Sequence, residues 1–188
     1  MSKALLVIDF INDICHPDGK IPSCAAHTKE QNAIEHANKA LSYARDNDWL
    51  TILVKVGFES NYHAQPKSSP VFGKANEFKA LELGEFGTEF HEDLDVKSTD
   101  FVLAKPRVNP FYGTTLEPVL RANKIDELYV CGVSTTWAIQ AVTRDAHDRD
   151  YKVTIIEDAC AAADQEEHVT SINTLSRIAN IIRADEIA

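Results

Sequence analysis

The sequence predicts an α/β fold with a mostly parallel sheet and helices on both of its faces. Short apolar runs alternate along the chain with longer stretches in which apolar residues recur every three or four positions. The apolar runs contain few polar residues, as expected for strands that are buried on both faces of a parallel sheet. The 188 residues, of which 44% are hydrophobic and 26% charged, are enough for one globular domain with a full core. We therefore expect a single domain over residues 1–188.

Five apolar runs are the expected strands. The first run, KALLVID, ends in Asp9, and the third is followed at once by Lys105 and Pro106. The expected strands cover residues 3–9, 50–57, 100–104, 126–132 and 151–156.

Four segments have the apolar spacing of amphipathic helices. In the first of them, Thr28 is a candidate N-cap, with Glu30 or Gln31 as its capping-box partner. Residues 58–98 show no strong periodicity, so we expect a long excursion with short helical pieces there. The expected helices cover residues 29–47, 114–123, 134–149 and 165–182.

Composition excludes several classes of function. Lys and Arg total 19 against 29 Asp and Glu, and the net charge of −10 disfavours nucleic acid and anionic membranes as partners. No apolar run approaches the ~20 residues needed to span a bilayer, and no signal peptide is visible. The sequence contains neither a GxGxxG after a strand nor a GxxxxGK[ST] motif. We expect a cytoplasmic protein that binds a small-molecule substrate and uses no cofactor.

The four cysteines form no CxxC pair and no spacing typical of metal ligands. We expect reduced thiols, because a disulfide framework is unusual in a chain of this size without a secretion signal. Cys15, six residues after Asp9, is the one placed to approach the carboxyl edge of the sheet. The other three are Cys24, Cys131 and Cys160.

Polar residues follow three of the expected strands where those strands end. Asp9 closes the first strand, Lys105 follows the third, and residues 132–138 lead from the fourth strand into a helix. Because ligands bind outside the carboxyl ends of strands in open α/β sheets, we expect these groups to converge in one crevice. Backbone N–H groups at residues 134–138 would stabilise an oxyanion there. Each residue also has a structural explanation, since Asp and Ser commonly cap turns and helices.

Two stretches carry a resemblance to a known family. ALLVIDFINDI in the first strand, and nearly all of residues 100–163 from LAKPRVNPFYG to VTIIEDACAA, resemble the isochorismatase-like cysteine hydrolase superfamily. That superfamily includes nicotinamidases, N-carbamoylsarcosine amidases and isochorismatases. The resemblance implies a Rossmann-like three-layer α/β sandwich with a mostly parallel, six-stranded sheet. It also implies a homo-oligomer, a dimer or larger.

The resemblance places the family's catalytic set on particular residues. The family's Asp and Lys fall on Asp9 and Lys105, and its GV-x-T motif falls on residues 132–135. The peptide between Val133 and Ser134 would be cis and would help to form an oxyanion hole. The family's nucleophilic cysteine, three residues after the motif threonine, falls on Ala138.

Ala138 departs from the family pattern in a way that changes the chemistry. A methyl group cannot attack a carbonyl, so thiolate attack and a thioester intermediate are ruled out at this position. None of the four cysteines replaces it on spacing. The Asp-x-His and second His that hold a metal in nicotinamidases are also missing, because residues 57–70 contain only His63. We therefore expect no metal.

Three functions remain compatible with the sequence. The first is a hydrolase of isochorismatase type, in which Asp9 acts as a general acid and Lys105 holds a substrate carboxylate. The second is a small-molecule-binding homologue without activity. The third is a cysteine amidase that has been inactivated by replacement of its cysteine at position 138 with alanine. In the first two, Ala138 is the natural residue. The expected apolar walls of the pocket are Phe10, Ile14, Phe58, Phe111, Tyr112 and Trp137.

Overall fold

The computed structural model describes residues 2–188, and within them six strands form one parallel sheet. The strands are β1 (Ser2–Ile8), β2 (Leu50–Val56), β3 (Phe101–Lys105), β4 (Ile125–Val133), β5 (Lys152–Ala161) and β6 (Asn180–Ile182). Their order across the sheet is β3-β2-β1-β4-β5-β6, and every neighbouring pair is parallel. The expected α/β class with six strands is confirmed, and the sheet is wholly parallel.

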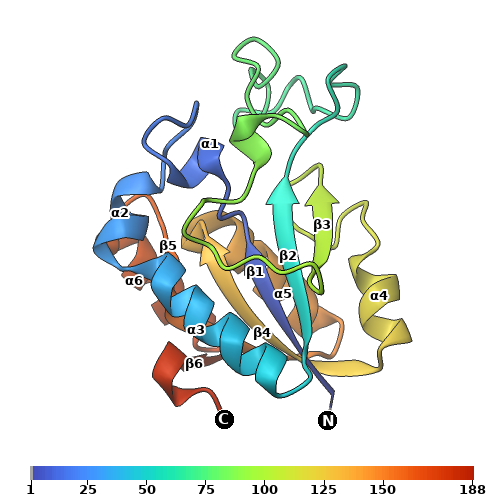
Figure 1. The fold of residues 1–188 in the computed structure, drawn as a ribbon, viewed down its shortest axis with the longest axis vertical. Coiled ribbons are helices and arrows are strands. Elements are labelled where there is room, and N and C mark those ends of the chain that lie inside the picture. The colour runs from blue at the N-terminus through green and yellow to red at the C-terminus, as the bar shows by residue number, and fades with distance from the viewer. Residues whose placement is uncertain (1) are drawn as a thin grey trace.

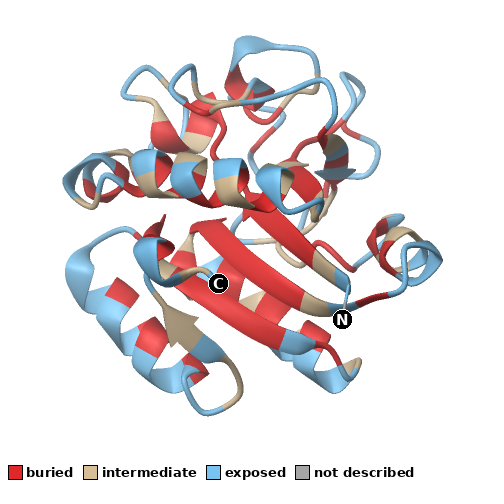
Figure 2. Cartoon of the chain, turned by 60° about the horizontal axis from the view of Figure 1, so that its bottom comes forward, coloured by how far each residue is buried: buried red, intermediate tan, exposed pale blue. Residues whose placement is uncertain are grey.

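Helices cover both faces of the sheet. The long helix α3 packs against one face, and α4, α5 and α6 lie on the other (Figure 1). Figure 2 shows the resulting three layers, with a buried sheet between helices whose outer faces are exposed. The α-helices are α1 (Asn12–Cys15), α2 (Ala25–Glu30), α3 (Ala33–Asp46), α4 (Leu116–Ala122), α5 (Gln140–Asp148) and α6 (Gln165–Leu175). Three shorter turns are η1 (Phe86–Thr88), η2 (Thr135–Ile139) and η3 (Ala184–Glu186).

Two of the expected helices differ from the structure. The first is divided into α2 and α3, because Asn32 adopts a left-handed backbone with φ of 51° that interrupts the helical ladder. Thr28 consequently lies inside α2, so its prediction as an N-cap is wrong. The last expected helix ends at Leu175, and its final expected residues, Asn180–Ile182, form β6, which pairs with the free edge of β5. Pairing of backbone groups with β5 outweighs the helical apolar spacing there.

The long excursion between β2 and β3 caps the carboxyl edge of the sheet, at the top of Figure 1. Its apolar side chains form a small second core with residues from the sheet edge. That core comprises Ile11, Val56, Phe58, Tyr62, Phe72, Ala75, Ala80 and Leu81. Because this core is anchored on β2, the excursion is a fixed wall over the sheet edge. Within residues 2–188, no helix has the length and apolar character that crossing a bilayer requires.

Gly132 allows β1 and β4 to approach each other at the sheet edge. Its φ of 125° lies in the region that side chains rarely adopt, and a Cβ there would overlap the backbone carbonyl of Ile8. Gly132 is the first residue of the GV-x-T segment, so this close approach also sets where that segment starts.

Gly132→Ala should therefore destabilise the protein by roughly 3 kcal/mol or more, measured as the free energy of unfolding in urea. Gly113→Ala is the matched control, because Gly113 has φ of 66° and only Pro106 comes as near as 3.9 Å to the added Cβ. Its expected cost is about 1 kcal/mol. Equal stability losses in the two variants would contradict the steric role of Gly132.

Candidate active site

A buried ion pair joins the ends of two strands that are not neighbours. Asp9 follows β1 and Lys105 ends β3, with β2 between them in the sheet. Lys105 Nζ donates to Asp9 Oδ2 at 2.7 Å and to the carbonyl of Arg107 at 3.1 Å. Asp9 Oδ1 accepts the N–H of Val56, at the end of β2, at 2.8 Å. The Asp9 carboxylate therefore ties together the carboxyl ends of three strands.

The backbone at Asp9 makes a sharp turn out of the sheet. Asp9 has φ of 59°, donates its N–H to the carbonyl of Val54, and accepts from Ile11 at 2.7 Å. A left-handed residue other than glycine costs roughly 1–2 kcal/mol, and Asp tolerates this conformation better than most. The turn ends β1 at the point where its side chain meets Lys105.

Burial dominates the electrostatics of Asp9. Asp9 is 4% exposed and Lys105 is 1% exposed. Burial raises the pKa of the Asp9 carboxyl above its usual value, and the Lys105 ammonium and the Val56 N–H only partly oppose this. A carboxyl with a raised pKa can exchange a proton nearer neutral pH than an ordinary aspartate.

The segment after β4 lies beside this ion pair. The peptide between Val133 and Ser134 is cis, as the resemblance implies. Residues 135–139 form a π-helical turn, η2, which continues into α5. Ser134 caps this turn, because its Oγ accepts the N–H of Thr136 at 3.2 Å and its carbonyl accepts the N–H of Trp137. Those two N–H groups are satisfied within the turn, and an oxyanion role for the backbone N–H groups of residues 134–138 stays a prediction.

These elements enclose a cavity of about 200 Å³. Asp9, Lys105, Ser134 and Ala138 all line it, so the structure brings the catalytic positions implied by the resemblance together. Its other walls are mostly apolar. They are Ile14, Ile21, Ser23, Cys24, Val56, Val71, Phe72, Leu81, Val108, Val133 and Trp137.

Of the six side chains expected as apolar walls, Ile14 and Trp137 line the cavity. The other four do not. Phe10 is fully buried in the main core, and Phe58 packs edge-on against Phe72 in the second core. Phe111 stacks on Tyr151 instead, and Tyr112 lies 61% exposed outside the cavity. Core packing in three cases, and exposure in the fourth, keeps these rings away from the cavity.

Sequence reasoning missed most of the wall. Val71, Phe72, Leu81 and Val108 come from loops with no periodicity, so nothing in the sequence indicates which of their side chains face Asp9. The segment from Ile21 to Cys24 also belongs to the wall. The one sequence feature that could have indicated this is that the segment follows the strand that ends in Asp9.

All four cysteines are free and buried. Burial raises the pKa of each thiol, to about 11 for Cys24 and about 12 for Cys160. Cys24 lines the cavity, whereas Cys15 donates to the backbone carbonyl of Asp9 at 3.7 Å. Thiols with raised pKa values are weak nucleophiles at neutral pH.

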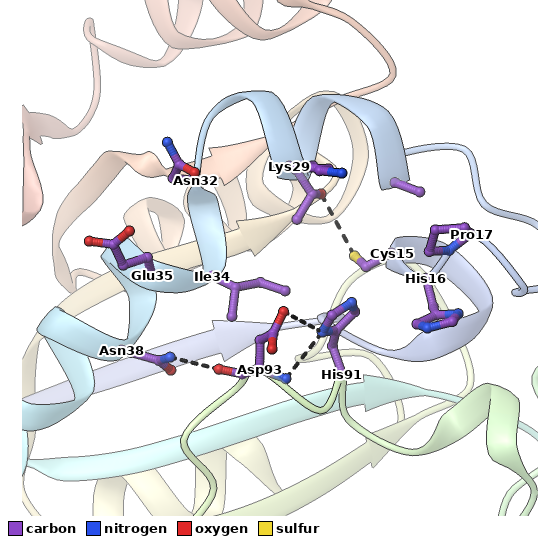
Figure 3. Close-up of a pocket in the computed structure, with 12 residues that line it drawn as sticks. Cys15, His16, Pro17, Lys29, Asn32, Ile34, Glu35, Asn38, His91 and Asp93 are labelled. Carbon is purple, nitrogen blue, oxygen red and sulfur yellow. Dashed lines mark hydrogen bonds and ion pairs between the residues drawn. The ribbon is translucent and has the colours of Figure 1, made fainter.

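A larger hollow of about 570 Å³ lies between α2, α3 and the loop at residues 91–93 (Figure 3). Two imidazoles line it, but the Nδ1 atoms of His16 and His91 already accept backbone N–H groups from Asp18 and Asp93. Neither Asp9 nor Lys105 lines this hollow. The smaller cavity is therefore the candidate active site. Residues 2–188 contain no cluster of three or more His, Cys, Asp or Glu that would hold a metal, and His63 is exposed.

The fold and the charged cavity define a class of α/β proteins whose site lies at the carboxyl edge of a parallel sheet. The Isochorismatase domain family matches residues 3–186, and the chain belongs to this family of hydrolases. It is 31% identical to an uncharacterised isochorismatase family protein, YecD, of Escherichia coli O157:H7, over 99% of this chain and 94% of that one.

Two further proteins with stated activities are similar. The ureidoacrylate amidohydrolase RutB of Acinetobacter baylyi is 29% identical, over 85% of this chain and 71% of that one. The crystal structure of N-carbamoylsarcosine amidase from Thermoplasma acidophilum is 25% identical, with a TM-score of 0.76, over 100% of this chain and 99% of that one. The family thus includes amide hydrolases.

A buried histidine holds the turn that carries Ala138. His168 of α6 places Nδ1 at 2.9 Å from Thr135 Oγ1, in η2. Its Nε2 lies 3.4 Å from the side-chain nitrogen of Gln31, and its ring meets that of His27 edge-on. Burial, together with His27, lowers the pKa of His168 to about 4. The neutral ring is therefore the form that contacts Thr135.

This lowered pKa predicts a specific pH dependence of stability. The unfolded chain takes up a proton on His168 near its ordinary pKa of 6.5, and the folded chain does not. The stability that His168 contributes is therefore complete above pH ~6.5 and is lost as the pH falls from there toward ~4. Between about pH 7.5 and 4.5, Tm should fall several degrees further in the wild type than in His168→Gln.

Differential scanning calorimetry measures this difference. His63→Gln, at an exposed loop position, is the control and should keep the wild-type decline in Tm. An unchanged decline in His168→Gln would show that His168 takes up its proton equally in the folded and unfolded chains.

Proposed function

We propose that this isochorismatase-family hydrolase cleaves a small cyclic or carboxylate-bearing metabolite, with Asp9 as general acid and without a thiol nucleophile. The observation that carries the proposal is the buried Asp9–Lys105 pair in a cavity that Ala138 also lines, at the position to which the resemblance assigns the family's cysteine. Water is the remaining nucleophile, and Asp9 carries the one carboxyl group among the residues that line the cavity.

The reaction that suits these groups is hydrolysis of a vinyl ether. Asp9 donates its proton to the terminal alkene carbon, and the adjacent carbon becomes an oxocarbenium ion. The Asp9 carboxylate left behind stabilises that cation. Water then adds to the cation and returns a proton to Asp9, and the hemiketal collapses to an alcohol and a ketone. Atoms and charge balance without a covalent enzyme intermediate.

The environment of Asp9 supports the acid role. Its pKa is raised by burial, which keeps the proton available nearer neutral pH. Lys105 opposes that shift, but it also fixes the orientation of Oδ2 at 2.7 Å. Apolar walls limit competing solvent in the cavity.

Asp9→Asn should reduce turnover by at least 10²-fold, because an amide cannot donate the proton, while the fold persists. Product formation from 2-phenoxyacrylate, a ring compound with one vinyl ether and one carboxylate, is the assay, with circular dichroism to establish folding. Asp148→Asn is the matched control, since it makes the same charge change at a side chain that is 81% exposed at the end of α5. A fully active Asp9→Asn variant would exclude Asp9 as the acid.

A cysteine amidase that has alanine at 138 is the second candidate, and the amide hydrolases among the similar proteins favour it. Ala138 lines the cavity and is 3% exposed, so a thiol placed there would face Asp9 and Lys105. If this candidate is correct, Ala138→Cys hydrolyses small amides such as nicotinamide and N-carbamoylsarcosine, and ammonia release rises at least 10²-fold over the wild type. Ala138→Ser is the control. No gain of amidase activity would remove this candidate.

The third candidate is a binding protein that has lost catalysis. It has the same cavity and differs only in product formation. Wild-type protein that binds 2-phenoxyacrylate but releases no product would favour it over the hydrolase.

A further inference from the structure

The cavity compensates a single negative charge. Among its lining residues, Asp9 and Lys105 are the only ones that carry charge, and they bind each other at 2.7 Å. The rest of the lining is apolar, apart from two serines and the Cys24 thiol. With Asp9 ionised, the lone ammonium of Lys105 is fully balanced. A second carboxylate beside it would have no partner charge in a buried site.

Two carboxylates that share one cation in a buried site cannot both remain ionised, and one of them takes up a proton. We propose that a substrate with one carboxylate binds at Lys105 together with a proton, which neutralises Asp9. The proton comes from solvent and forms the O–H bond of Asp9. The substrate carboxylate then takes over the ion pair with Lys105. This inference rests on the proposed function, because it describes how the acid at that site is loaded.

The geometry allows Lys105 to serve both partners. Its Nζ has three N–H groups, of which one goes to Asp9 Oδ2 and one to the carbonyl of Arg107. Both Lys105 and Asp9 line the cavity, so a ligand carboxylate can approach the remaining N–H. Asp9 Oδ1 stays bound to the Val56 N–H throughout.

No other group near Asp9 replaces it as the proton acceptor. The titratable groups that face Asp9 are Lys105 from β3, Cys15 from α1, and Cys24 from the segment before α2. Both thiols are already protonated at neutral pH, because burial raises their pKa values. The ends of β2 and β4 contribute Val56 and Val133, which do not titrate. The bound proton therefore resides on Asp9.

Two consequences define the substrate class. Binding of a monocarboxylate brings the proton onto Asp9, so the general acid is in its protonated form whenever the substrate is bound. A dicarboxylate leaves its second charge unpaired in the cavity, since no second cation lines it. The favoured substrate is a compact ring with one carboxylate.

Benzoate and benzamide are suitable probes, because they share a ring and differ in charge. Isothermal titration of the wild type over about pH 5.5–8 should show the benzoate Kd rising roughly tenfold per pH unit above the pKa of Asp9, with one proton taken up per ligand. The proton uptake is read from the heat in two buffers of different ionisation enthalpy. Benzamide binding should not change with pH.

Variants separate this coupling from other pH effects. In Asp9→Asn, the benzoate Kd should lose its pH dependence and be at least tenfold lower than in the wild type at pH ~8, because Lys105 no longer has an ionised partner. Asp148→Asn, the same charge change at an exposed site, should behave as the wild type. Lys105→Met should weaken benzoate at least tenfold and leave benzamide unchanged.

The outcomes distinguish this inference from the proposed function. A benzoate Kd that is independent of pH in the wild type, without proton uptake, overturns the coupling even if Asp9→Asn abolishes turnover. Failure of benzoate to bind the wild type at pH ~5.5 also overturns it. These two outcomes are measured on the wild type alone, so the inference can be overturned even if Asp9→Asn folds poorly. If the wild type takes up a proton on binding benzoate and Asp9→Asn keeps full turnover, Asp9 is not the general acid, but the coupling of binding to protonation stands.

Discussion

The buried ion pair between Asp9 and Lys105 is the constraint on which the sheet edge depends. Asp9 holds the end of β2 through the Val56 N–H and the end of β3 through Lys105. Removing either partner leaves the other charge uncompensated in the interior, which costs stability unless the remaining group becomes neutral. The pair therefore serves the fold and the site together. Its position at the carboxyl edge is where parallel α/β sheets gather their ligands.

The sequence predicted the parts of this arrangement that repeat along the chain. Apolar runs located five of the six strands, and the strand ends placed Asp9 and Lys105 at one edge of the sheet. The short strand β6 was missed because its three residues follow the same apolar spacing as the preceding helix. The division between α2 and α3 depends on one left-handed residue, Asn32, which apolar periodicity does not reveal.

The cavity was harder to predict than the charged groups in it. Phe72, Leu81 and Val108 reach it from segments without regular structure, so their direction depends on tertiary contacts. Phe10 and Phe58 have suitable chemistry for a wall, yet both fill cores. The position of Ala138 is the exception. A family motif located it by spacing, and the structure places its methyl group in the cavity wall.

The state of the Asp9 carboxyl in the ligand-free protein tests the central claim most directly. Selective carbon-13 labelling and NMR titration of that carboxyl would give its pKa. The account predicts a midpoint clearly above the ordinary aspartate value of about 3.9, because burial outweighs the attraction of Lys105. A midpoint at or below that value would mean that Lys105 dominates, and Asp9 would then be a permanent structural counter-ion and not an acid.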